Sequence, residues 1–130
     1  MTLADDVYTV CSGDATLTGL VGDRIYAWRQ MTGDFPQVVY TPPVAYDDSA
    51  ARDHDGDVTR ADVIVQFDCY AETGNEAEAV ANALISLWSG YQSSSPDVGY
   101  AFVSNKIADG YVSSMDVYRV IVDVMMNVGV

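Results

Sequence analysis

Residues 62–90 read DVIVQFDCYAETGNEAEAVANALISLWSG and contain the two strongest structural signals in the chain. In the first half, Val63, Val65 and Phe67 alternate with polar residues such as Asp62 and Gln66. A period of two is typical of a strand with one buried and one solvated face. The pattern therefore predicts a half-buried strand over residues 62–69.

The second half of this stretch predicts an amphipathic helix. Its apolar side chains recur at helical spacing and share one face, at Ala77, Val80, Ala81, Leu84 and Trp88. Asn75, with Glu78 three residues later, has the pattern of a capping box, although Asn replaces the usual Ser or Thr. Gly90 is placed to end the helix.

Weaker signals lie on the N-terminal side of this stretch. Leu3, Val7 and Val10 fall at i, i+4 and i+7, which predicts a helix that ends at Gly13. Further short elements are expected as a helical turn over residues 15–20 and as strands over 24–28 and 35–40. We expect Pro42-Pro43 to stop the last of these strands or leave it at an edge, because proline cannot donate to a β-ladder.

Two strands are expected on the C-terminal side. One starts at residues 100–103 and ends before a turn at Asp109-Gly110. The closing strand, over residues 118–128, has apolar residues at alternate positions, and Ile121 and Met125 make its second face partly apolar too. This favours a sheet whose helix-free face has a further partner, often a neighbouring subunit.

The order of elements is helix, strands, helix, strands, which predicts an α+β fold. We expect an antiparallel sheet of four to five strands with two main helices packed on one face. Residues 1–130 contain no internal repeat and no linker long enough to divide them, so a single domain is expected.

Composition excludes several classes of protein. The 130 residues include 19 Asp and Glu against 6 Lys and Arg, for a net charge of −13, and 49% of them are hydrophobic. A disordered acidic chain would be poor in apolar residues. The longest apolar runs fall far short of the roughly 18 residues that cross a bilayer. Nucleic-acid binding normally needs a cationic surface, which this chain lacks.

The acids are densest in the segment 47–62, which carries a net charge of −4. Such charge is costly to bury unpaired, so we expect an acidic loop or hairpin arm at about residues 43–61. Its candidate partner-contact residues are Tyr46, Asp47, Asp48, Asp53, Asp55 and Asp57. The alternating aspartates resemble the start of a calcium loop, but Val58 replaces the required glycine and Ile64 the bidentate glutamate. A solvated turn is favoured over a metal site.

No catalytic constellation is visible in the sequence. His54 is the single histidine, and no Gly-x-Ser-x-Gly elbow or phosphate-binding glycine loop accompanies it. Cys11 and Cys69 are too few for a disulfide framework or zinc site and are expected to be buried, reduced thiols. We therefore predict no enzyme activity, no cofactor and no metal. Nine tyrosines and two tryptophans instead favour protein contacts.

Several segments together resemble a known family. VGDRIY at 21–26 and FPQVVY at 35–40 are similar to the opening of the small tail-completion or tail-terminator proteins of long-tailed viruses. VIVQFDCYA at 63–71, followed by an Ala- and Glu-rich helix, and YRVIVDV at 118–124 resemble the middle and last strand of that family. The aspartate-rich interlude and the near absence of lysine depart from it.

The resemblance implies a structural virion protein that forms a ring, typically a hexamer, at the head-proximal end of the tail tube. Such a ring ends tail polymerisation and joins the tail to the neck. Its implied partners are further copies of itself, the tail-tube protein on one face and a neck protein on the other. Viral DNA passes through the lumen without specific binding, and assembly takes place in the host cytoplasm, away from membranes. The family has no catalytic residues to carry over.

Two other readings remain open at this stage. The chain fits another neck connector, such as a stopper or adaptor, or a small cytoplasmic acidic binding domain with a cation site at Asp53–Asp57. The abundance of Asp beside one lysine, Lys106, is also typical of proteins from very salty cytoplasm, as in a haloarchaeal tailed virus.

Overall fold

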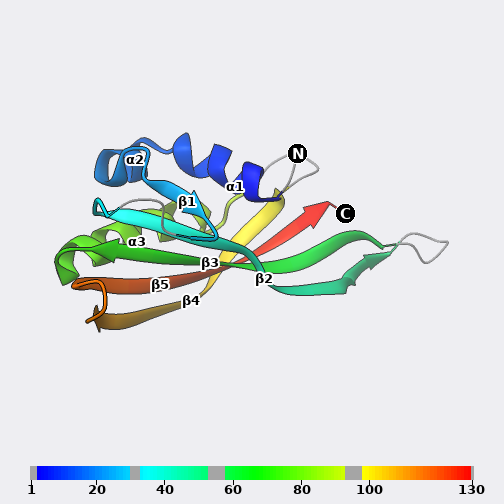
Figure 1. Cartoon of the computed structure of the whole chain (residues 1–130). Coiled ribbons are helices and arrows are strands. Elements are labelled where there is room, and N and C mark those ends of the chain that lie inside the picture. Colours follow the sequence, from blue (N-terminus) through cyan, green and yellow to red (C-terminus); the bar gives the residue numbers. More distant parts are fainter. Residues whose placement is uncertain (1–2, 30–32, 53–57, 93–97, 130) are drawn as a thin grey trace.

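A computed structural model describes residues 3–29, 33–52, 58–92 and 98–129 of the chain. The helices of this part are α1 (Leu3–Ser12), α2 (Ala15–Val21) and α3 (Gly74–Trp88). Its strands are β1 (Ile25–Ala27), β2 (Gln37–Arg52), β3 (Val58–Ala71), β4 (Val98–Val112) and β5 (Val117–Gly129). Figure 1 shows one long twisted sheet with the helices gathered against it.

The strands form a five-stranded sheet in the order β1-β2-β3-β5-β4. This confirms the α+β class, but the expectation of a purely antiparallel sheet is wrong, because β1 pairs with β2 in parallel. The two strands are parallel because of the connection between β1 and β2. Residues 28–36 are too many for a tight hairpin turn, and they return the chain to the start of the neighbouring strand before β2 begins.

All three helices of the described residues contribute to one buried cluster on a single face of the sheet (Figure 1). α3 packs on β3, β4 and β5, α2 packs on α3, and α1 packs on β1 and β2. The two main helices expected from the sequence are α1 and α3. The centre of the core is aromatic: the ring centroids of Tyr40 and Phe67 lie 5.9 Å apart, and those of Phe67 and Trp88 lie 6.1 Å apart. The Tyr40 hydroxyl donates to the Ala4 carbonyl at 2.8 Å, which ties α1 to the sheet.

The start of α3 differs from the expectation. Thr73 is the N-cap, and its side chain accepts a hydrogen bond from the backbone N–H of Glu76 at 3.2 Å. Asn75 lies inside the helix and does not cap it. Threonine with glutamate three residues later is the more usual capping pair, and it lies two residues before the pair chosen from the sequence.

The prolines do not stop β2. The strand passes through Pro42-Pro43 to Arg52, and its register with β3 shifts between Thr41 and Ala45. β1 pairs only with residues 38–40, so β2 is itself an edge strand beyond Tyr40. A proline is tolerated at an irregularity in an edge strand, because a free edge needs no N–H donor.

β4 also runs past its expected end. Asp109-Gly110 lies inside the strand, at one of three register shifts between β4 and β5, and the chain turns only after Val112. Gly110 has a φ of 86°, a conformation that glycine adopts without steric cost. The glycine therefore permits a bulge in the strand instead of a hairpin turn.

Candidate functional site

The acidic segment joins two paired strands. The backbone pairing of β2 with β3 continues to Arg52 opposite Val58 and sets Asp47 opposite Asp62. In Figure 1 this pair of strands extends to the right past the end of β5. Of the predicted contact residues, Tyr46, Asp47 and Asp48 belong to β2, and their side chains lie outside the described part.

The other three predicted contact residues, Asp53, Asp55 and Asp57, lie outside the described residues, and so does His54. The structure therefore brings the backbone of residues 46–48 onto the strand pair and leaves the role of all six side chains a prediction. Among the described residues, no three acidic, histidine or cysteine side chains gather closely enough to hold a metal ion. None of the helices in the described part is long and apolar enough to cross a membrane.

The two thiols lie in the core. Cys11 and Cys69 are both free and buried. Burial raises the pKa of the Cys11 thiol to about 12 and raises that of Cys69 further. A thiol held in its neutral form is a poor nucleophile and a poor metal ligand, so both residues act as packing side chains.

The sheet has a second face that the helices leave uncovered, which we call the open face. Cross-strand register places three rows of side chains on it, each running over β3, β5 and β4. The rows are Ile64, Met125 and Phe102; Gln66, Asp123 and Asn105; and Asp68, Ile121 and Ile107. Phe102 is 48% exposed and Ile107 43% exposed, so the β4 end of this face is a water-exposed apolar surface.

Carboxylates lie between the apolar side chains of the open face. Desolvation raises the pKa of Asp68 above its ordinary value, although the Gln66 amide donates to it at 3.0 Å. Desolvation and the charge of Asp68 also raise the pKa of Asp123. The Oδ1 atom of Asp123 is buried and has no hydrogen-bond partner. The open face therefore carries two desolvated carboxylates, and the positive charge of Arg119 acts on one of them, Asp68.

The basic residues nearest to this charge are already paired. The Arg119 side chain donates to the Asp109 carboxylate, with its Nε atom at 2.7 Å. The ammonium group of Lys106 lies on the helix side and forms an ion pair with Glu78 of α3. β4 and β5 therefore supply no unpaired cation to Asp123.

A second group of exposed apolar side chains lies at the β1 side of the fold. Its members come from neighbouring elements, and we call them the β1 patch: Tyr8 of α1, Leu20 of α2 and Trp28 immediately after β1. Trp28 is 61% exposed and has a φ of 74°, a conformation that is uncommon for a bulky residue. Its backbone N–H donates to the Tyr40 carbonyl at 2.7 Å, which holds the chain in this conformation.

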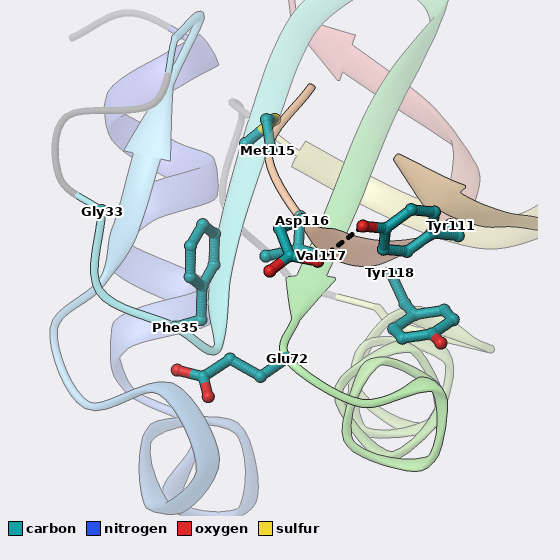
Figure 2. Close-up of a pocket in the computed structure, with 8 residues that line it drawn as sticks. All are labelled: Gly33, Phe35, Glu72, Tyr111, Met115, Asp116, Val117 and Tyr118. Carbon is teal, nitrogen blue, oxygen red and sulfur yellow. Dashed lines mark hydrogen bonds between the residues drawn. The ribbon is translucent and has the colours of Figure 1, made fainter. Parts of the chain in front are cut away.

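A pocket of about 460 Å³ lies at the end of the sheet where β3 ends and β4 turns into β5 (Figure 2). It is lined by Gly33, Phe35, Glu72, Tyr111, Met115, Asp116, Val117 and Tyr118. The Tyr111 hydroxyl donates to Asp116 Oδ1 at 2.5 Å, and this bond raises the pKa of Tyr111. The described lining contains no lysine, arginine, histidine or cysteine.

Sequence reasoning missed both the pocket and the β1 patch. The pocket joins residues near 33, 72 and 115, which only the tertiary fold brings together. For Trp28, the sequence showed an aromatic residue in a short strand or loop but not that a left-handed backbone would expose it. The open face was partly visible in advance, since Ile121 and Met125 lie on the second face of β5 as their spacing predicts.

Comparisons with a protein family and with a solved structure both cover nearly the whole chain. The family model for "Tail completion protein gp17" matches residues 5–128. A chain in the solved structure of the virion of a native gene transfer agent (GTA) particle superposes with a TM-score of 0.71 and 21% sequence identity. The superposition covers 95% of this chain and 92% of that one, so the two share a fold. No curated protein matches by sequence.

Proposed function

The chain belongs to the tail completion protein gp17 family, a family of structural virion tail proteins, and from this premise we propose that it forms the terminating ring of a viral tail. In this proposal the ring is a hexamer at the head-proximal end of the tail tube. It ends tube polymerisation on one side and joins the tail to a neck protein on the other. The role is structural and involves no catalysis.

The family match carries the proposal, because it extends from α1 to β5 and leaves no described element outside it. The surface of the molecule supports it. A closed ring is built from head-to-tail contacts, so each subunit must present two different adhesive surfaces. The open face and the β1 patch are two such surfaces, and they are built from different elements.

Within the ring, we assign the acidic arm to partner contact. The paired strands β2 and β3 extend the arm past the end of β5, where its aspartates can reach a neighbouring subunit or the tail tube (Figure 1). Removing residues 48–58 should leave the ring intact and reduce joining of tails to heads. Normal joining by this variant would contradict the role of the arm.

The charge of the chain fits a passage for DNA. A hexamer would carry 6 × −13 = −78 charges, and the acids that face a lumen would repel the phosphate backbone. DNA would therefore pass through without sticking. The virion is the expected location of the mature protein, after assembly in the host cytoplasm.

Two measurements test the proposal. Native mass spectrometry and negative-stain imaging of the purified protein should give a closed ring, and adding that ring to growing tail tubes should stop their elongation. A protein that stays monomeric and never caps tubes would refute it. A ring that binds heads or portal complexes but ignores tubes would identify another neck connector instead, such as a stopper or adaptor.

A further inference from the structure

We propose that neighbouring copies of the chain contact each other through opposite edges of the sheet, with the β1 patch of one copy seated on the β4 end of the next copy's open face. This inference rests on the proposed ring and specifies its subunit contact. The proposed partner for both surfaces is a second copy of this chain.

The first observation is where the exposed apolar side chains lie. The described residues include eight large hydrophobic side chains that are exposed. Three form the β1 patch, and three belong to β4: Tyr100, Phe102 and Ile107. The remaining two, Tyr111 and Tyr118, line the pocket at the end of the sheet. None lies on the described parts of β2 or β3.

The sheet order sets these two groups at opposite edges, since β1 is the first strand and β4 the last. Figure 1 shows α1, α2 and β1 at the top of the molecule and the second half of β4 at the bottom, while the first half of β4 rises toward α1. A two-fold dimer would need a single self-complementary patch. Two different patches at opposite edges instead fit a head-to-tail contact that repeats around a ring.

The second observation is the conformation of Trp28. A tryptophan in the left-handed region is strained, and such strain persists where the surroundings enforce it. Here the hydrogen bond to Tyr40 enforces it, and the result is an indole that is 61% exposed. Tryptophan is also among the residues most enriched at the energetic centres of protein interfaces. The fold therefore presents Trp28 as an anchor for a partner.

The third observation is complementary charge. Arg29, next to Trp28, is exposed and forms no ion pair with any described residue. Asp123 on the open face has a buried oxygen without a hydrogen-bond partner. An arginine from the neighbouring copy would place its positive charge beside the Asp123 carboxylate while Trp28 covers Phe102 and the apolar row beside it.

These three observations define a test by substitution. Trp28→Ala and Phe102→Ala each remove an apolar contact, and each should raise the protein concentration at half-assembly by at least about tenfold. Arg29→Asp and Asp123→Arg should each weaken assembly, and the double variant, which exchanges the two charges, should restore it. Tyr111→Ala and Glu76→Arg are matched controls, because they change an exposed aromatic and an exposed acid outside both surfaces.

Sedimentation velocity across a concentration series measures assembly, and circular dichroism melts confirm that each variant folds. If the wild-type chain forms rings that these substitutions leave unchanged, the contact is wrong while the ring stands. If the single charge variants fail to assemble and the double variant does not restore assembly, the pairing of Arg29 with Asp123 is wrong. A wild-type chain that remains monomeric at every concentration overturns both the ring and the contact.

Discussion

The N-cap of α3 gives a prediction whose size follows from the structure. Thr73 is exposed, and its side chain makes one described hydrogen bond, to the backbone N–H of Glu76. Thr73→Ala removes that acceptor without opening a cavity, so the loss is that of an N-cap, about 1 kcal/mol of unfolding free energy. An unfolding entropy of about 2.1 cal/mol/K per residue over 130 residues converts this loss to a fall in Tm of about 4 °C.

Asn75→Ala is the matched control, since Asn75 is also exposed but lies inside the helix. Alanine has the higher helix propensity, so this variant should be as stable as the wild type or slightly more so. Thr73→Ser should retain most of the stability because it keeps the capping oxygen. Urea and thermal unfolding followed by circular dichroism measure all three. If Asn75→Ala costs as much as Thr73→Ala, Thr73 is not the cap.

Three further predictions concern the core, the open face and the net charge. Phe67→Ala, at the centre of the aromatic core, should cost about 3–5 kcal/mol in urea unfolding, and a loss below 1.5 kcal/mol would contradict its burial. The raised pKa of Asp68 means that its ionised form destabilises the fold, a penalty that is absent below its ordinary pKa of 3.8 and complete above the raised value. Asp68→Asn should therefore raise Tm at neutral pH and lose that advantage in melts below about pH 3.8, whereas a neutral-pH Tm equal to wild type would be inconsistent with desolvation. The charge of −13 should make Tm rise between low and molar KCl, and a flat or falling Tm would rule out adaptation to salt.

The sequence correctly predicted the elements in which the spacing of hydrophobic residues matches the face that the fold buries. The alternation of Val63, Val65 and Phe67 and the helical spacing up to Trp88 both correspond to the observed burial. Here the local pattern and the tertiary environment agree, because each element buries one face against the other. The α+β class followed from the order of such elements.

The errors occurred where a neighbouring strand overrode a local signal. Asp109-Gly110 is a turn signal, yet β5 holds the chain extended through it by means of a bulge. Pro42-Pro43 does not stop β2 but lies where that strand is an edge, which was the other alternative expected from the sequence. The parallel pairing of β1 depends on a long connection, and the sequence of a three-residue strand does not indicate the direction in which it pairs. The exposed Trp28 likewise depends on a backbone conformation that composition does not reveal. The predicted contact residues of the acidic arm remain a prediction.

The three bulges of β4 have a consequence for how the protein behaves at high concentration. A long, regular strand at the edge of a sheet is a template for fibril growth, because its free N–H and C=O groups accept another strand. Here one edge, β4, is interrupted at three points. The other edge consists of the three residues of β1 and, beyond Tyr40, of β2, which contains Pro42-Pro43 and shifts its register with β3. Neither edge offers a continuous ladder to a second sheet. Copies of this chain can therefore reach a high concentration with little tendency to form amyloid.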